Sequence, residues 1–162
     1  MIIGVYPGTF DPFTFGHLDI AEKAAKFVDK LYIAVAIDSS KSEMFSALER
    51  VEIISREISA SSNIAKIEVI SFKGLLINFA RQVNAQIIIR GLRAISDFEY
   101  EFQMSCMNSK LNNNIDTIFI PASEKMQLVS SRIVKEVVRL GAETPEFASN
   151  YVQNKIKEHY KK

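Results

Sequence analysis

Apolar and polar positions along the chain follow two recurring patterns, one typical of strands and one of helices. The predicted strands are apolar-rich runs at 2–6, 31–37, 67–72, 86–89 and 117–120. The run 31–37 is apolar throughout, as expected of a parallel strand covered on both faces by helices. Elsewhere apolar residues recur every three or four positions, which indicates helices. These helices are predicted over 18–28, 46–59, 75–83, 98–111 and 130–140, with a last one from Thr144.

Residues with capping and turn preferences mark several predicted ends. Ser46 is followed three residues later by Glu49, which predicts a capping box. Asp97 is the expected N-cap of the helix from residue 98. Pro145 suits the first turn of the last helix, and the polar tail 155–162 is expected to be frayed.

Strands that alternate with helices through short connections predict a parallel sheet with right-handed crossovers. We therefore expect an α/β fold: a Rossmann-like five-stranded parallel sheet, helices on both faces and a C-terminal helical extension. Neither a repeat nor a linker is evident, so residues 1–162 are expected to form a single domain.

Composition narrows the class of partner. Hydrophobic residues make up 48% and charged residues 24% of the sequence, which is ordinary for a globular protein. Lys and Arg number 20 against 19 Asp and Glu, so net charge gives no reason to expect nucleic acid or a membrane as partner. A binding site for an anion would therefore depend on a local group of residues and not on the net charge of the chain.

Cysteine and histidine usage indicates a reduced protein without its own metal site. The single cysteine, Cys106, lies in an apolar run and is expected to be buried. His17 and His159 lie at opposite ends of the chain, without metal-ligand spacing, so no metal-ligating residues are predicted. With no signal-type or spanning apolar segment in view, we expect a cytoplasmic location.

The loop at 7–17, PGTFDPFTFGH, follows the first predicted strand and precedes a helix. Gly8 and Gly16 allow close backbone approach to a ligand, while Thr9 and His17 supply donors near the positive end of the helix. These features predict a polyphosphate site. The alternative is an ordinary strand-to-helix connection with a surface histidine.

Two common nucleotide signatures are absent. The first strand is not followed by Gly-x-Gly-x-x-Gly, and no Gly-Lys-Ser/Thr P-loop occurs. Dinucleotide-dependent redox chemistry and P-loop hydrolysis are therefore disfavoured.

Further candidate residues follow the later strands, where ligands bind in open α/β sheets. They are Lys41 after the second strand, Arg90 to Arg93 after the fourth, and Ser130 and Ser131 after the fifth. Each has a simpler explanation: a solvated loop lysine, a plain helix cap, or arginines paired with Asp97, Glu99 or Glu101 on the next helix.

A family resemblance joins these observations. Gly8-Thr9-Phe10-Asp11-Pro12 with Thr14-Phe15-Gly16-His17 resembles the (H/T)xGH signature of the nucleotidyltransferase superfamily. Further stretches resemble bacterial phosphopantetheine adenylyltransferases, in order over nearly the whole chain: Ser40-Lys41, Met44-Phe45, Asn78-Phe79-Ala80-Arg81, Ile89-Arg90-Gly91-Leu92-Arg93-Ala94, Asp97-Phe98-Glu99-Tyr100-Glu101, and Val129-Ser130-Ser131 with Val134-Lys135-Glu136-Val137.

The resemblance implies transfer of AMP from ATP to 4′-phosphopantetheine, with Mg²⁺ present, giving dephospho-coenzyme A and pyrophosphate. The acceptor phosphate would attack the α-phosphorus in line, without a covalent intermediate. The family's homohexamer is also implied.

The resemblance assigns roles to particular residues. Those implied in catalysis are His17, Lys41 and Arg90. Those implied in binding phosphopantetheine are Thr9, Lys41, Leu76 and Arg90. Those implied in binding ATP are Thr9, Phe10, His17, Gly91, Leu92, Arg93, Glu101, Met126, Gln127, Leu128, Val129, Ser130, Ser131 and Arg132.

Three residues depart from the family pattern. Phe15 stands where Asn is frequent, Met126 where Trp is frequent, and Arg132 where a third Ser or Thr is usual. Two alternatives stay open. One is another small nucleotidyltransferase, acting on nicotinamide mononucleotide or using CTP. The other is a non-catalytic nucleotide-binding module, which loss of His17, Thr9 or Lys41 would have favoured.

Overall fold

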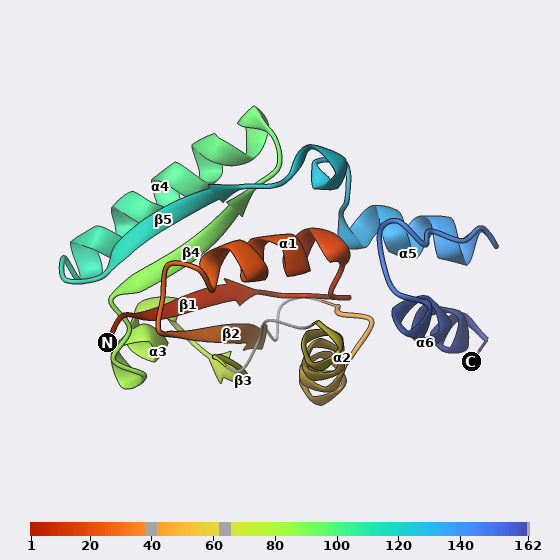
Figure 1. The fold of residues 1–162 in the computed structure, drawn as a ribbon, viewed down its shortest axis with the longest axis horizontal. Helices are drawn as coiled ribbons and strands as arrows, with labels where there is room; N and C mark the ends of the chain where they lie inside the picture. Colours follow the sequence, from red (N-terminus) through yellow and green to blue (C-terminus); the bar gives the residue numbers. More distant parts are fainter. Residues whose placement is uncertain (38–41, 62–65, 162) are drawn as a thin grey trace.

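Five parallel strands form one sheet in the order β3-β2-β1-β4-β5 (Figure 1). Their bounds are β1 Ile3–Gly8, β2 Lys30–Ile37, β3 Ile67–Lys73, β4 Ile87–Leu92 and β5 Asp116–Pro121. The computed structural model describes residues 1–37, 42–61 and 66–161. From β1 the chain winds outward to β3 and then returns to β4 on the other side of β1, so the switch point of the sheet lies between β1 and β4.

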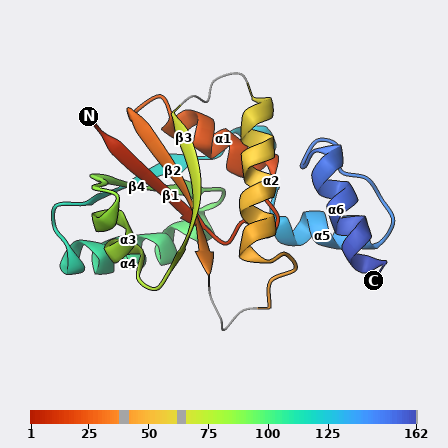
Figure 2. The same ribbon diagram turned by 90° about the horizontal axis from the view of Figure 1, so that it is seen from below.

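Helices cover both faces of this sheet, which confirms the predicted fold class (Figure 2). Helices α1 (Phe15–Ala24) and α2 (Ala47–Ala60) lie on one face, and α3 (Leu76–Gln82) and α4 (Ile95–Leu111) on the other. After β5 come a 3₁₀ turn, η1 (Glu124–Met126), and the C-terminal helices α5 (Ser131–Arg139) and α6 (Asn150–Tyr160). Within the described residues, none of the helices has the length and apolar character needed to cross a membrane.

The core has two parts because successive strand residues point to opposite faces. Tyr6 and Ile89 belong to the cluster packed by α1, α2, α5 and α6. Val5 and Ile88 belong to the cluster packed by α3. These neighbouring residues of β1 and β4 are therefore covered on opposite faces of the sheet, which explains why successive residues there are apolar.

Two helix starts follow their predicted chemistry. Ser46 and Glu49 form the capping box of α2, with the Ser46 N–H donating to the Glu49 carboxylate at 2.8 Å. Ser130 is the N-cap of α5, and its hydroxyl accepts a hydrogen bond from the Ile133 N–H.

The start of α4 differs from the prediction. The helix begins at Ile95 with Ala94 as N-cap, three residues earlier than expected. Asp97 lies inside the first turn, where its carboxylate accepts hydrogen bonds from the Arg93 N–H and side chain. Asp97 is thus engaged with the preceding residues, and the predicted N-cap role was wrong.

The last helix begins later than predicted. Residues 144–149 form a turn, and α6 begins at Asn150 with Ser149 as N-cap. The buried Gln153 side chain holds this turn by accepting from the Thr144 N–H and donating to the Ala148 carbonyl. Residues 155–160 are helical rather than frayed, because Ile156 is fully buried in the core.

Strand β4 runs further than predicted. Arg90, Gly91 and Leu92 are strand residues paired with β5, and only Arg93 follows the strand end. A Cβ atom on Gly91 would lie 2.9 Å from Ile20 Cγ1. The missing side chain therefore allows α1 to pack closely against the end of β4.

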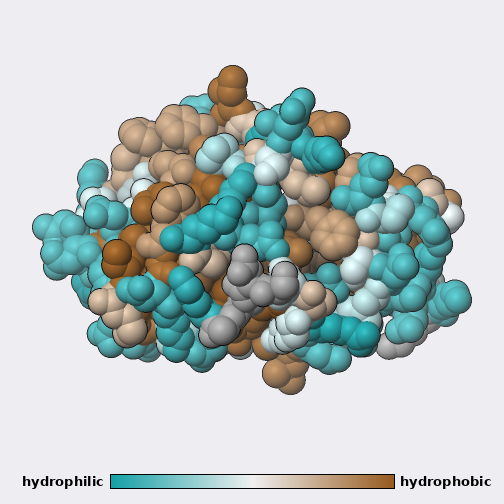
Figure 3. All heavy atoms as spheres, viewed as in Figure 1, coloured by the Kyte–Doolittle hydropathy of each residue, from teal (hydrophilic) through white to brown (hydrophobic). Residues whose placement is uncertain are grey.

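Cys106 is exposed, so its predicted burial was wrong. On α4 the sole buried residue is Asn108, because the helix rests on β4 and the edge strand β5 along a narrow contact. Apolar side chains consequently reach the surface on the α4 and β5 side of the molecule (Figure 3).

Candidate active site

A cavity of about 690 Å³ opens beyond the carboxyl ends of β1 and β4, at the switch point of the sheet. Its volume falls in the range of about 300–1,000 Å³ typical of small-molecule sites. The lining comes from the end of β1 and the loop after it, the start of α1, the segment before α2, the end of β4, the residue after β5 and the start of α5. The residues are Tyr6, Pro7, Gly8, Thr9, Phe10, Asp11, Thr14, Gly16, His17, Ile20, Ser42, Glu43, Arg90, Gly91, Arg93, Ala122, Val129, Ser130, Ser131, Arg132 and Lys135.

The loop between β1 and α1 turns sharply at residues 10–12. Phe10 has φ = 51°, and the Asp11–Pro12 peptide bond is cis. The Phe10 ring folds back over Gly8, where a Cβ atom would lie only 2.8 Å from it. Gly8 therefore permits the position of Phe10, whose ring contacts His17 edge to face at 5.1 Å.

His17 is held with one ring nitrogen committed to the protein. The Thr14 N–H donates to Nδ1 at 3.0 Å, and the Thr14 hydroxyl lies 3.0 Å from the same atom. A neutral imidazole that accepts at Nδ1 carries its proton on Nε2. His17 thus has an Nε2–H donor for a ligand in the cavity.

The environment of His17 keeps its ring neutral. Burial, with a smaller contribution from the nearby Arg93 charge, lowers the pKa of His17 to about 4. The ring also stacks on Phe13 at 5.5 Å. At neutral pH the side chain is therefore an uncharged hydrogen-bond donor rather than a cation.

Arg90 and Arg93 both meet carboxylates of α4. Arg90 makes a bidentate contact with Glu101 at 2.6 and 2.5 Å, and its Nη1 donates to the Pro7 carbonyl at 3.1 Å. Arg93 pairs with Asp97 at 3.3 Å. Both arginines still line the cavity, so pairing with the acidic helix and lining the site are compatible.

The start of α5 supplies the other polar part of the wall. The Ser131 hydroxyl donates to the Pro12 carbonyl at 2.7 Å, which ties α5 to the loop after β1. Arg132 and Lys135 line the cavity beside it. The cavity thus combines hydroxyls, a helix start and several cations, a set of groups suited to phosphates.

The predicted site residues separate into three groups. Those that line the cavity are Thr9, Phe10, His17, Arg90, Gly91, Arg93, Val129, Ser130, Ser131 and Arg132. Those outside its lining are Leu76, Leu92, Glu101, Met126, Gln127 and Leu128. Lys41 lies outside the described residues. Glu101 nevertheless reaches the site indirectly, since it holds Arg90.

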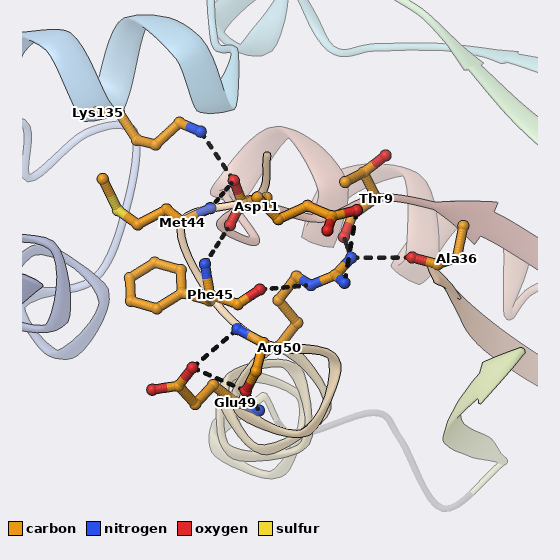
Figure 4. A network of polar contacts seen from close by, with 10 residues as sticks. Thr9, Asp11, Ala36, Met44, Phe45, Glu49, Arg50 and Lys135 are labelled. Carbon is orange, nitrogen blue, oxygen red and sulfur yellow. Dashed lines mark hydrogen bonds and ion pairs between the residues drawn. The ribbon is translucent and has the colours of Figure 1, made fainter. Parts of the chain in front are cut away.

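Three polar residues near the loop had no predicted role: Asp11, Arg50 and Lys135 (Figure 4). Arg50 is 1% exposed and donates to main-chain carbonyls of Phe45, Thr9 and Ala36 at 3.0, 2.7 and 3.0 Å. In sequence it is a helical arginine on an amphipathic segment, and its burial arises only from tertiary packing. Asp11 lay within the recognised motif, whereas nothing local indicated Lys135 as its partner.

Acidic groups do not gather into a metal-binding cluster in the part of the chain that the structure describes. Of the carboxylates that line the cavity, Asp11 binds Lys135 and two main-chain amides. Glu43 lies 3.7 Å from Arg50. Neither arrangement provides a set of protein ligands for a cation.

Comparison with known proteins agrees with the geometry. A profile of the family described as "Cytidylyltransferase-like" matches residues 5–137. Among curated relatives, the phosphopantetheine adenylyltransferase of Caulobacter vibrioides is 54% identical over 91% of this chain and 90% of its own. That of Pelagibacter ubique is 47% identical over 98% of both chains. The chain belongs to the phosphopantetheine adenylyltransferase family.

Solved structures extend the likeness beyond the phosphopantetheine adenylyltransferase family. A Plasmodium falciparum nicotinic acid mononucleotide adenylyltransferase, complexed with NaAD, has a TM-score of 0.73 at 14% identity, over 97% of this chain and 95% of that chain. At this identity the likeness concerns the fold alone. The curated relatives confirm the sequence resemblance to phosphopantetheine adenylyltransferases. The solved structure shows that the Rossmann-like fold is shared with a more distant protein.

Proposed function

We propose that the chain transfers AMP from ATP to 4′-phosphopantetheine, giving dephospho-coenzyme A and pyrophosphate. Family membership supports this activity. The structural observation that supports this activity is the orientation of His17. Its Nδ1 accepts from the Thr14 N–H, which leaves the Nε2–H for a ligand in a cation-lined cavity. A donor placed in this way stabilises charge that develops on a phosphoryl group.

The reaction is a direct in-line displacement. A phosphate oxygen of the acceptor forms a bond to the α-phosphorus of ATP, while the bond from that phosphorus to the bridging oxygen breaks and pyrophosphate leaves with the electron pair. His17 donates from Nε2 to an α-phosphoryl oxygen and keeps its proton throughout. The protein's contribution is positioning and charge stabilisation, as in other phosphoryl-transfer sites.

The cationic residues divide between the two substrates. Arg90, held by Glu101, binds the acceptor phosphate together with Lys41, while Leu76 contributes to seating that substrate. Arg93 and the stretch 126–132 bind ATP, with Thr9 and Phe10 close to the phosphates. The location of Arg90 and Arg93 at neighbouring points of one cavity supports this division.

Magnesium fits this proposal as an ion that arrives with ATP. Mg²⁺ is commonly held by substrate phosphates and water with few protein ligands, in keeping with the absence of an acidic cluster among the described residues. When bound, it supplies neutralisation of phosphate charge. The residues named above bind and orient the substrates around it.

We also propose a homohexamer in the cytoplasm. Exposed apolar side chains along α4 support contact with further copies. Tyr100, Met104, Met107 and Leu111 recur at helical spacing and are 63%, 41%, 53% and 44% exposed. A single exposed thiol is in keeping with a reducing compartment.

Pyrophosphate release with a panel of acceptors tests the activity. The purified protein, ATP and Mg²⁺ are combined separately with 4′-phosphopantetheine, pantetheine, nicotinamide mononucleotide and nicotinic acid mononucleotide, and CTP is tested with glycerol 3-phosphate. We expect release only with ATP and 4′-phosphopantetheine. Turnover of a mononucleotide or of CTP instead would assign the chain to another nucleotidyltransferase activity, and binding of ATP without any release would indicate a non-catalytic module.

A further inference from the structure

Asp11 joins three separate segments of the chain. Its carboxylate accepts hydrogen bonds from the Met44 and Phe45 N–H groups, each at 2.9 Å, and pairs with Lys135 Nζ at 2.8 Å (Figure 4). The residue is 7% exposed. Both carboxylate oxygens are therefore used within the protein: Oδ1 by the segment before α2, and Oδ2 by that segment and by α5.

Neighbouring residues of the same loop are also tied to other elements. The Thr9 carbonyl accepts from Arg50 of α2 at 2.7 Å, and the Pro12 carbonyl accepts from Ser131 of α5 at 2.7 Å. The loop that connects β1 with His17 is thus fixed by contacts on two sides. Its position relative to α5 depends on the Ser131 bond and on the Asp11–Lys135 pair.

This arrangement matters because the loop and the start of α5 form two parts of one cavity wall. His17 belongs to the first part and Arg132 to the second. A displacement of about 1 Å between groups that act on one substrate can reduce turnover by about 10²-fold. Contacts that fix the two parts therefore bear directly on catalysis.

We propose that Asp11 and Lys135 are positioning residues: their ion pair sets the loop that carries Thr9 and His17 against α5. The inference rests on the proposed adenylyl transfer. In this role Lys135 acts through Asp11 and not on the substrate. The Lys135 side chain is 26% exposed and that of Asp11 only 7%. Loss of the pair can therefore cost stability as well as turnover, and the two effects are measured separately.

Two substitutions of Lys135 test the role. Lys135→Met removes the ion pair and keeps much of the aliphatic side chain, and we expect it to lower kcat about tenfold, with the dissociation constant of ATP changed less than about threefold. Lys135→Arg restores a cation and is expected to keep kcat within about threefold of the parent. Arg139→Met is the matched control, because Arg139 lies on the same helix and pairs with the exposed Glu136.

The Asp11→Asn variant completes a double-mutant cycle. Once the Asp11 carboxylate is gone, adding Lys135→Met should lower kcat by less than twofold. An equal tenfold loss in both backgrounds would overturn the proposal, as would a loss of ATP affinity larger than the loss of kcat, since either result means that Lys135 acts directly on the ligand.

Folding and activity are checked separately. If Asp11→Asn does not fold, Lys135→Met and Lys135→Arg still test the positioning role. For each of these two variants, kcat and the dissociation constant of ATP are measured without the Asp11 substitution. A kcat of Lys135→Met equal to that of Arg139→Met would also reject the role. Failure of the proposed function is distinct, since the parent protein would then release no pyrophosphate with 4′-phosphopantetheine.

Discussion

Thr14 determines the chemical form of His17, because its N–H occupies Nδ1 and leaves the proton on Nε2. A neutral ring at this place donates a hydrogen bond without adding a positive charge. The positive charge around the substrates is supplied instead by the arginines that line the same cavity, Arg90, Arg93 and Arg132. One residue therefore donates the directed hydrogen bond, and other residues supply the positive charge.

Removal of the His17 donor should affect turnover far more than ATP binding. We expect His17→Ala to lower kcat by about 10²-fold or more, because a donor used mainly in the transition state has effects of this size. His17→Gln retains an N–H donor on a side chain of similar reach and should recover part of this loss. Pyrophosphate release and calorimetric ATP binding measure the two effects, and near-normal turnover of His17→Ala would contradict the role.

Stability should fall in weak acid because of His17. The folded pKa is about 4, well below the usual 6.5, so between these values the unfolded chain binds a proton that the folded chain does not. Proton binding by the unfolded chain is small above pH 6.5. It lowers the free energy of unfolding as pH decreases from 6.5 towards 4. Linkage gives a loss of about 2 kcal/mol between pH 7.5 and pH 5.0.

Urea unfolding at these two pH values measures the loss. His17→Gln cannot titrate and should show a pH dependence smaller by about that amount. Equal pH dependence in the two proteins would mean that His17 titrates normally in the fold.

At the scale of elements, local sequence determined most of the fold. The capping box at Ser46 and the apolar run of β2 depend on neighbouring residues, and both were predicted. The late start of α6 was not, because it depends on Gln153, a polar residue buried against a turn nine residues earlier. Long-range side-chain contacts of this kind leave no periodic signal.

The same distinction applies to the site. The loop at 7–17 was recognised from its own sequence, and its predicted convergence with Arg90 and Ser130 is present in the cavity. Arg50 was missed because a buried arginine and an exposed one look alike in an amphipathic pattern. The binding roles assigned by family resemblance, including that of Lys41, stay predictions.

Helix α2 is anchored to the site by Arg50, so Arg50→Lys should be costly. A lysine ammonium can donate to one of the Phe45, Thr9 and Ala36 carbonyls but cannot span all three. We expect a loss of about 2–4 kcal/mol in the free energy of unfolding, since buried carbonyls then lack donors. Urea unfolding measures this loss.

Arg56→Lys on the same helix is the control for this substitution. Arg56 lies over the Tyr151 ring at 4.0 Å, and its replacement should cost less than about 1 kcal/mol. Equal losses for the two substitutions would show that the carbonyl contacts of Arg50 contribute little.

At the scale of the whole molecule, the exposed apolar stripe on α4, formed by Tyr100, Met104, Met107 and Leu111, should control assembly. We expect a mass of about 110 kDa for six copies of the 18.3 kDa chain, measured by light scattering after size exclusion. Met107→Glu should lower this mass, because it places a charge within the stripe. Phe27→Glu, at a residue outside α4 that is 62% exposed, is the control. A monomeric parent, or a hexameric Met107→Glu protein, would contradict the assembly or its location.

The exposed thiol of Cys106 gives this protein a natural attachment point for a spectroscopic probe. Because the chain has one cysteine, a maleimide dye would label a single position without engineering. That position is on α4, so donor- and acceptor-labelled copies, once mixed, would exchange energy when they join one assembly. Fluorescence could then follow subunit association in real time, at concentrations too low for light scattering.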